Sequence, residues 1–255
     1  MKCWAVVTGA GTGIGAALAK ELTKHGLQVL AIGRRSDPLL QMQKECHFPD
    51  AIFPLAVDIS TDEGQQKIFN AIPVDDSLKY LVQNAAVGVP SRIEDIKRED
   101  FEYALAVNVT APIMLTKGFL PKLKNSGGRI LHLGTNVAFK AQLGTTTYGV
   151  TKMAFHRLYE QLKVELAGSG VFVASVHPGV VKTEGLWEHI RLANEHHLPH
   201  VTYFDWVQKE GKMLTADFSA KFLTFVLMNT KDEEYSQEWH IHDEKHWSRW
   251  KNETK

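Results

Sequence analysis

A glycine-rich segment near the N-terminus, Thr-Gly-Ala-Gly-Thr-Gly-Ile-Gly at residues 8–15, limits what this chain can fold into more than any other feature. It follows an apolar, strand-like run and opens an amphipathic, helix-like segment at residues 14–24. In such a place Gly9 permits a tight turn, Gly13 lets a ligand approach the backbone, and Gly15 lets the helix pack close to a sheet. Free amides at the helix start can bind a pyrophosphate, so the segment predicts a dinucleotide site. A turn with a purely structural role is the alternative.

Apolar runs alternate with helical patterns along most of the chain, which is typical of repeated β-α-β units. The strand-like runs are Cys3–Thr8, Val29–Gly33, Ile52–Val57, Tyr80–Gln83, Arg129–Leu133 and Val171–His177, with a last one near Glu238–Ile241. Runs with little alternation of apolar and polar residues fit strands that helices cover on both faces. We therefore predict an α/β protein with a Rossmann-type, doubly wound parallel sheet. Its 255 residues fit a single domain spanning residues 1–255.

The composition argues against several classes of function. With 29 basic and 29 acidic residues the formal net charge is zero, so charge favours neither nucleic acid nor an anionic membrane as a partner. Cys3 and Cys46 lack the spacing of a disulfide framework or a cysteine zinc site. No leader-like segment precedes the first strand-like run, and no stretch reaches the ~18 apolar residues of a membrane helix. We expect a soluble, cytoplasmic protein.

The end of the second strand-like run bears on the choice of cofactor. In dinucleotide-binding folds a carboxylate there accepts from a ribose hydroxyl of NAD, whereas an arginine meets the 2′-phosphate of NADP. Here the run ends in Gly33-Arg34-Arg35. A charge-assisted hydrogen bond from Arg34 is worth about 1.5–3 kcal/mol, roughly a tenfold to hundredfold preference. We predict NADP(H) over NAD(H); a solvated surface pair of arginines is the alternative.

Tyr148 and Lys152 form the second informative pair. Their spacing of four residues places the phenol and the ammonium on one face of a helix. A tyrosine with the usual pKa near 10 exchanges protons poorly at neutral pH, but an adjacent cation favours the phenolate and lowers that pKa. The pair therefore predicts a proton donor, although any long helix can carry such a pair by accident.

These residues and several further motifs resemble the short-chain dehydrogenase/reductase family over nearly the whole chain. The matches are the cofactor motif at residues 8–15, Asp58 as the adenine-contacting acid, Asn84-Ala85-Ala86 at a strand end, Asn108 as the catalytic-helix asparagine, Tyr148 with Lys152, and Pro178-Gly179 followed by Thr183. Six matches in the family's order make a chance resemblance improbable.

The resemblance implies roles for these positions. Tyr148 would protonate a substrate carbonyl, Lys152 would bind the nicotinamide ribose and lower the phenol pKa, and Asn108 would support a proton-relay water. The implied catalytic set is Asn108, Thr135, Tyr148 and Lys152. The implied cofactor-binding set is Gly9, Thr12, Gly13, Ile14, Gly15, Arg34, Arg35, Asp58, Ile59, Asn84, Ala85, Tyr148, Lys152, Pro178, Gly179, Val181 and Thr183.

The chain departs from the family pattern at four positions. Thr135 stands where the catalytic serine is usual; its hydroxyl can still donate to a substrate oxygen, but its methyl group restricts χ1. Gln83 and Ala86 replace the usual Asn and Gly at the strand end. Thr12 stands where many NADP-using relatives have a basic residue, so the predicted preference for NADP(H) depends on Arg34 and Arg35.

The C-terminal part resembles the sepiapterin reductase and benzil reductase group, which implies an α-dicarbonyl or related ketone substrate. The segment at residues 184–213 is rich in apolar and aromatic residues and predicts a substrate lid, although many of them can pack the lid onto the core. Asp243 is interpreted either as a substrate contact or as a turn or cap residue. Histidines cluster without recognised metal-ligand spacing, so no metal is predicted; they are His196, His197, His200, His240, His242 and His246.

Together these features predict an NADPH-dependent carbonyl reductase with Tyr148 as the proton donor. An NAD-linked alcohol dehydrogenase and a non-catalytic nucleotide-sensing protein of the same fold are the alternatives. The family resemblance implies a homodimer or homotetramer, and the helical segments at residues 101–123 and 155–166 offer faces for it.

Overall fold

The computed structural model describes residues 2–251 and contains one seven-stranded parallel sheet of order β3-β2-β1-β4-β5-β6-β7. The strands are β1 (Cys3–Thr8), β2 (Gln28–Gly33), β3 (Ile52–Ala56), β4 (Ser77–Gln83), β5 (Arg129–Leu133), β6 (Phe172–His177) and β7 (Glu238–His240). The order runs in opposite directions on the two sides of β1 and β4. The predicted doubly wound Rossmann-type sheet is therefore confirmed, and its switch point lies between these two strands.

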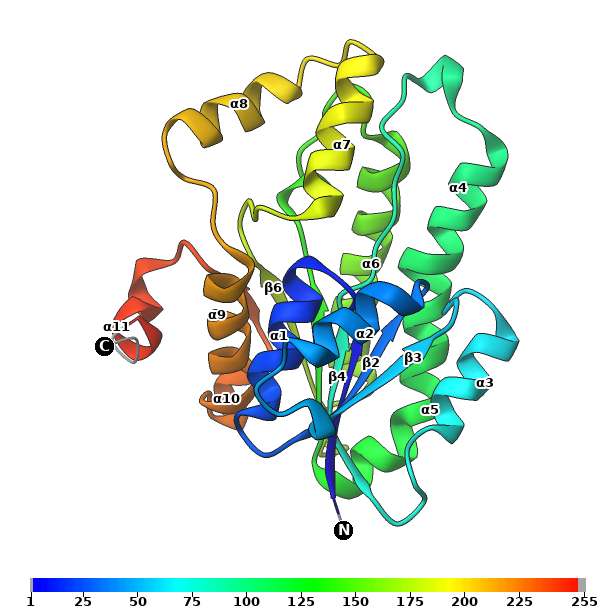
Figure 1. Cartoon of the computed structure of the whole chain (residues 1–255), viewed down its shortest axis with the longest axis vertical. Helices are drawn as coiled ribbons and strands as arrows, with labels where there is room; N and C mark the ends of the chain where they lie inside the picture. Colours follow the sequence, from blue (N-terminus) through cyan, green and yellow to red (C-terminus); the bar gives the residue numbers. More distant parts are fainter. Residues whose placement is uncertain (1, 252–255) are drawn as a thin grey trace.

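Helices cover both faces of the sheet (Figure 1). The main helices are α1 (Gly13–Thr23), α2 (Ser36–Lys44), α3 (Asp62–Asn70), α4 (Arg98–Leu105), α5 (Ala111–Ser126), α6 (Thr146–Glu165), α7 (Glu184–Glu195), α8 (Val201–Lys209) and α9 (Ala216–Met228). One apolar cluster joins α1, α2 and α9 to one face, and a second joins α3, α5 and α6 to the other. Short helices α10 (Asp232–Tyr235) and α11 (Trp247–Trp250) flank β7.

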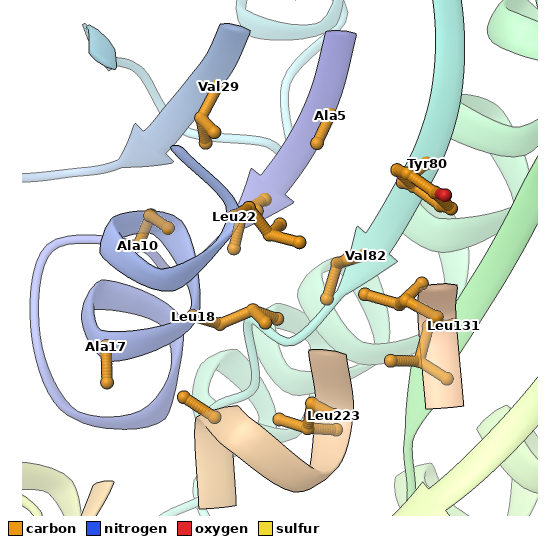
Figure 2. Packing of buried hydrophobic residues seen from close by; sticks show 14 of the residues in the cluster. Ala5, Ala10, Ala17, Leu18, Leu22, Val29, Tyr80, Val82, Leu131 and Leu223 are labelled. Carbon is orange, nitrogen blue, oxygen red and sulfur yellow. The ribbon is translucent and has the colours of Figure 1, made fainter. Parts of the chain in front are cut away.

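The first of these clusters shows why α1 packs where it does. Leu18 and Leu22 are four residues apart, share one face of the helix, and are fully buried against the sheet and α9 (Figure 2). Burying each leucine contributes about 1.5–3 kcal/mol. The glycine turn before α1 is thereby held against the carboxyl end of β1.

The strand predictions were correct in number and order but not at every boundary. β4 begins at Ser77, three residues before the predicted start, because Ser77 and Leu78 pair with Cys3 and Trp4 of β1. That pairing is tertiary and leaves no local pattern in the sequence. The helix predicted after the glycine turn and the one at residues 216–228 are both present.

The run Arg98–Ser126 corrects the expectation that no stretch is apolar enough for a membrane helix. It is 29 residues long, and an 18-residue window within it has a mean hydropathy of 1.2. In the fold its second half is a core helix, since Leu115, Phe119 and Leu123 are buried in the cluster that also holds Leu81 of β4. Between α4 and α5 the run contains a π-helical turn, η3 (Ala106–Thr110).

The predicted lid segment forms α7 and α8, which extend beyond the sheet at the end opposite the N-terminus (Figure 1). At the C-terminal end Trp250 is 2 % exposed and packs on Phe218 and Phe222 of α9. Aromatic packing therefore holds α11 on the domain.

Candidate active site

A cavity of about 480 Å³ opens at the carboxyl ends of β1, β2 and β4, beside the switch point of the sheet. Ligands of open α/β sheets bind in this position. Eleven of the predicted cofactor residues line it: Gly9, Thr12, Gly13, Ile14, Arg34, Arg35, Asp58, Ile59, Asn84, Ala85 and Thr183. Residues from five loops, those after β1, β2, β3, β4 and β6, thus meet in one cleft.

The glycine turn has the backbone geometry that the sequence predicted. Gly9 and Gly13 have φ angles of 66° and 58°, in the left-handed region that disfavours side chains. A Cβ on Gly15 would lie 2.2 Å from the carbonyl oxygen of Gly9, so only glycine lets α1 start this close to the turn. Asn84 Nδ2 donates to the carbonyl oxygens of Thr8 and Gly9 at 2.8 and 3.1 Å and ties the turn to the end of β4.

The start of α1 is suited to an anion. Thr12 is its N-cap residue but makes no capping hydrogen bond with its side chain, whereas the N-cap threonines Thr61, Thr183 and Thr215 each accept one from a backbone amide. The first turn of α1 contains no acidic residue. The start of α1 lines the cleft with Gly13 and Ile14. The backbone amides there can donate hydrogen bonds to a pyrophosphate, and the positive end of the helix dipole favours its negative charge.

At the end of β2 two arginines have different partners. Arg34 Nη1 donates to Tyr103 Oη at 2.9 Å, and that hydroxyl donates to Asp58 Oδ2 at 2.9 Å. Burial raises the pKa of Asp58, but hydrogen bonds from Ser60 and Tyr103 outweigh it and hold the pKa below its usual value. Arg35 instead forms a two-point ion pair with Glu184 at the start of α7, at 3.2 and 2.9 Å. Arg35 therefore links the cofactor cleft to the lid.

Sequence reasoning missed Tyr103, which lines the same cleft and joins Arg34 to Asp58. It lies on α4, 45 residues after Asp58. No motif surrounds it, so only the tertiary structure reveals its contact with the two predicted residues.

The proposed proton donor lies in the first turn of α6. Tyr148 is partly buried, and the loop residue Gly88 packs so close that a Cβ there would lie 2.8 Å from the Tyr148 Cβ. Burial raises the pKa of Tyr148 to about 12. This corrects the expectation that Lys152 lowers the pKa of the phenol.

The physical reason lies in the hydrogen bond that Lys152 makes. Its Nζ donates to the carbonyl oxygen of Leu133 at 2.6 Å and lies 4.3 Å from the ring centre of Phe155. Lys152 is 4 % exposed, and burial lowers its pKa to about 7. A partly neutral ammonium aimed at the end of β5 does little to stabilise a phenolate.

Thr135 and Lys152 share the lining of a narrow pocket that is too small to admit water. Thr135 directly follows the end of β5 and Gly134, and its Oγ1 caps the short helix η4 (Asn136–Ala138) by accepting from the amide of Val137 at 3.3 Å. The structure therefore places Thr135 in the same pocket lining as Lys152, and the Thr135 hydroxyl also caps η4.

Asn108 lies in the π-helical turn and is 2 % exposed. Its side chain accepts from the amide of Val87 at 2.9 Å and donates to the Val87 carbonyl and to Thr151 Oγ1 at 2.6 and 2.9 Å. It thus joins the loop after β4 to α6 at the residue before Lys152. Its implied support of a proton-relay water stays a prediction.

Replacing Asn108 by Ala is expected to lower the free energy of unfolding by about 1–3 kcal/mol, because Val87 loses two partly buried backbone hydrogen bonds and Thr151 a buried one. A urea titration of Asn108→Ala measures the loss. The surface residue Asn70, whose Oδ1 accepts an exposed hydrogen bond from Gln66, is the control: Asn70→Ala should change little. Equal stability of Asn108→Ala and the wild type contradicts the assigned role.

Besides Tyr148 and Lys152, four predicted cofactor residues do not line the main cleft. Gly15 does not line the cleft, because it packs against the backbone of Gly9 and lets α1 start close to the turn. Pro178, Gly179 and Val181 belong to the loop after β6, where Val181 is 5 % exposed and bridges Leu214. Asp243 is a cap, as its Oδ1 accepts from the amide of Lys245 at 3.1 Å, so the interpretation as a substrate contact is not supported.

A buried histidine near this site makes stability depend on pH. Burial, followed by the charge of Lys152, lowers the pKa of His132 to about 3, against about 6.5 in an unfolded chain. Stability from such a group is complete above about pH 6.5 and is lost as pH falls toward the folded value.

Below about pH 6 we expect the free energy of unfolding to decrease by up to about 1.4 kcal/mol per pH unit from His132. Urea titrations between neutral and mildly acidic pH measure this slope. The His132→Phe variant keeps a ring stacked on Phe155, whose centre is 4.3 Å away, and should have a shallower slope. A slope equal to that of the wild type would remove His132 as a cause.

The sheet topology, the glycine turn at the switch point and the Tyr-Lys pair on α6 define a Rossmann-type oxidoreductase. A sequence profile described as short chain dehydrogenase matches residues 3–191. The chain belongs to the short chain dehydrogenase family.

Known relatives agree with this assignment. An uncharacterized oxidoreductase from Staphylococcus epidermidis is 31% identical over 182 residues, covering 70% of this chain and 78% of the relative. An uncharacterized oxidoreductase from Staphylococcus aureus is 30% identical over 181 residues, with the same coverage.

Solved structures show the same fold. The KRED1-Pglu enzyme superimposes with a TM-score of 0.83 at 21% identity, covering 93% of this chain and 100% of its own. A putative NAD(P) dependent gluconate 5-dehydrogenase from Beutenbergia cavernae, described with bound NADP, has a TM-score of 0.80 at 25% identity and 94% coverage of both chains.

Proposed function

We propose that this oxidoreductase uses NADPH to reduce a ketone or α-dicarbonyl compound to an alcohol. The observation that carries the proposal is the Tyr148–Lys152 pair, one turn apart on α6, with Lys152 lining the same narrow pocket as Thr135 at the end of β5. The phenol of Tyr148 is protonated at neutral pH, and a developing alkoxide is basic enough to take its proton. A protonated phenol serves as the acid that carbonyl reduction needs, whereas alcohol oxidation needs a base.

The cleft beside the switch point supplies the cofactor site. Gly9 and Gly13 have no side chains that would keep a ligand from the backbone, and the amides at the start of α1 would bind the pyrophosphate. Asp58 would contact the adenine end of the cofactor, and Arg34 would bind the 2′-phosphate. The bound reduced nicotinamide supplies a hydride. NADP in the similar Beutenbergia cavernae structure and the absence of an acid at the end of β2 both favour NADP(H) for this chain.

Three side chains serve the carbonyl. Tyr148 donates the proton, and Thr135 hydrogen-bonds the substrate oxygen from the end of β5. Lys152, with a pKa near 7, can take up and release a proton at neutral pH and so restore the phenol. General acid catalysis of this kind contributes roughly 10²–10⁴ in rate.

The lid favours a hydrophobic substrate. Trp187, Tyr203 and Trp206 of α7 and α8 are 41%, 47% and 48% exposed. Exposed aromatic rings on two helices above the sheet can cover a bulky ketone, and pockets for such ligands are mainly apolar. This supports the α-dicarbonyl or related ketone that the resemblance to sepiapterin and benzil reductases implies.

The test is a panel of diketones, quinones, pteridines, steroids and simple aldehydes, with consumption of NADPH or NADH followed by absorbance. Turnover that is faster with NADPH supports the proposal. Oxidation of alcohols with NAD and no reduction at neutral pH favours the NAD-linked dehydrogenase.

A non-catalytic nucleotide sensor is the second candidate, because Lys152 is hydrogen-bonded to Leu133 and Thr135 serves as a cap. Tight NADPH binding with no turnover on the whole panel would support it.

The proposal also places the enzyme in the cytoplasm as a homodimer or homotetramer that binds a small carbonyl compound and neither nucleic acid nor membrane. Val164 of α6 is 74% exposed and Ile113 of α5 is 36% exposed, which fits a contact between subunits on these helices. Light scattering of the purified protein measures the assembly.

A further inference from the structure

A polar stripe crosses the sheet edge under α6. β6 and β7 are parallel neighbours in which Ser175 pairs with Glu238 and His177 with His240. Because side chains alternate along a strand, these four residues share one face of the sheet. Trp239, between the two β7 residues, faces the opposite layer and is buried there with Phe225. The register therefore places His177, Glu238 and His240 side by side.

The donor atoms of this group lie close together. The Nε2 atoms of His177 and His240 are 3.9 and 3.7 Å from Glu238 Oε2, and one donor atom from each of the three residues falls within 4.8 Å of the others. His156 of α6 brings a fourth donor, with its Nε2 3.2 Å from Glu238 Oε1. Ligands bound tetrahedrally at about 2.1 Å lie about 3.4 Å apart, so side-chain shifts of roughly an ångström suffice for His177, Glu238 and His240.

His177 gives an independent sign that this group binds a ligand. It is 5 % exposed, and within residues 2–251 neither ring nitrogen makes a hydrogen bond. Buried polar atoms in native proteins almost always have a partner. An imidazole whose ring nitrogens lack a hydrogen-bond partner in residues 2–251 thus lies 3.9 Å from a carboxylate oxygen of Glu238. The ring of His240 stacks on it with a centre distance of 4.2 Å.

We propose that His177, Glu238, His240 and His156 bind a divalent transition metal, with Zn²⁺ as the natural occupant. Imidazole nitrogens with one carboxylate oxygen suit Zn²⁺ better than Mg²⁺ or Ca²⁺, which take oxygen ligands. The His240 side chain is 44% exposed and gives the ion a route from solvent. The proposal departs from the prediction of no metal, which considered histidines by their spacing in the sequence.

The site lies directly behind the active-site loop. His177 Nε2 is 3.0 Å from the position that a Cβ on Gly134 would take, and Gly134 precedes Thr135. The ring of Phe139 contacts His156 and His177, with ring centres 4.6 and 6.1 Å apart. A bound metal would fix β7, α6 and this loop relative to one another, so we assign it a structural role.

An ordinary ion pair between His156 and Glu238 is the alternative reading, and metal titration separates the two. The full-length protein is freed of metal with a chelator and titrated with Zn²⁺ by calorimetry, and with Co²⁺, whose visible spectrum reports tetrahedral coordination. We expect a single Zn²⁺ per chain. His240→Asn and Glu238→Gln should each weaken it roughly tenfold to hundredfold, as loss even of outer partners does at metal sites.

The exposed turn residue His25 supplies a matched control, since His25→Asn should leave Zn²⁺ binding unchanged. NADPH binding by every variant shows that it is folded, and the metal readout does not depend on catalysis. A wild-type protein without Zn²⁺ binding overturns the proposal. Binding that His240→Asn and Glu238→Gln weaken no more than His25→Asn also overturns it and marks adventitious binding elsewhere.

Discussion

The Tyr148→Phe variant is expected to lose roughly 10²–10⁴ of its turnover while it binds NADPH as tightly as the wild type. The change removes one oxygen and leaves the ring, so the packing against Gly88 is kept. What it removes is the proton that the developing alkoxide must receive. Steady-state turnover on the best carbonyl of the panel, with NADPH affinity from fluorescence titration, measures both quantities.

Tyr159→Phe is the control for this prediction. Tyr159 lies on the same helix, is 3 % exposed, and packs in the apolar cluster against the sheet without any assigned part in the reaction. Its turnover should stay near the wild-type value. Full activity of Tyr148→Phe would remove Tyr148 from the mechanism, while weak NADPH binding by that variant would point to a structural defect.

The Arg34→Ala variant is expected to bind NADPH roughly tenfold to hundredfold more weakly, with little change for NADH. Only NADPH carries the 2′-phosphate that the guanidinium would meet at the end of β2. Arg34 already lies on the cleft, held by Tyr103 Oη at 2.9 Å, so its position is largely set before the cofactor arrives. Binding titrations with both cofactors give the ratio.

Arg35→Ala is the matched comparison. Arg35 is paired with Glu184, and a phosphate would have to compete with that carboxylate. We therefore expect a smaller loss of NADPH affinity than for Arg34→Ala. If Arg34→Ala weakens NADPH and NADH equally, the residue does not read the 2′-phosphate, and the NAD-linked alternative gains support.

Local sequence signals were sufficient for the architecture and for half of the site. Each strand-like run is short, apolar and bounded by glycine or polar residues, and consecutive parallel strands need a helix between them, so the order of elements follows from the pattern. The glycine turn was predictable because it too is a local signal in the sequence. Its function depends on backbone conformation over eight neighbouring residues, and glycine is the residue that permits it.

The surroundings of Tyr148 and Lys152 were less predictable. Spacing places Tyr148 and Lys152 on one helical face, but it does not show that Lys152 reaches the carbonyl of Leu133, 19 residues away in the sequence. It also does not show how deeply either group is buried. Desolvation raises the pKa of Tyr148 and lowers the pKa of Lys152, and both shifts disfavour a phenolate paired with an ammonium. The depth of burial that causes them is set only when the chain folds.

The sequence by itself determined the fold class, the glycine turn, the family and the placement of Tyr148 and Lys152 on one helix, because these depend on residues that are neighbours in the chain. Only the tertiary structure decided the contact of Tyr103 with Arg34 and Asp58, the pairing of Arg35 with Glu184, and the meeting of His156, His177, Glu238 and His240. These contacts join helices and strands that are distant in sequence. They arise from strand register and helix packing, which bring side chains together after the backbone has folded.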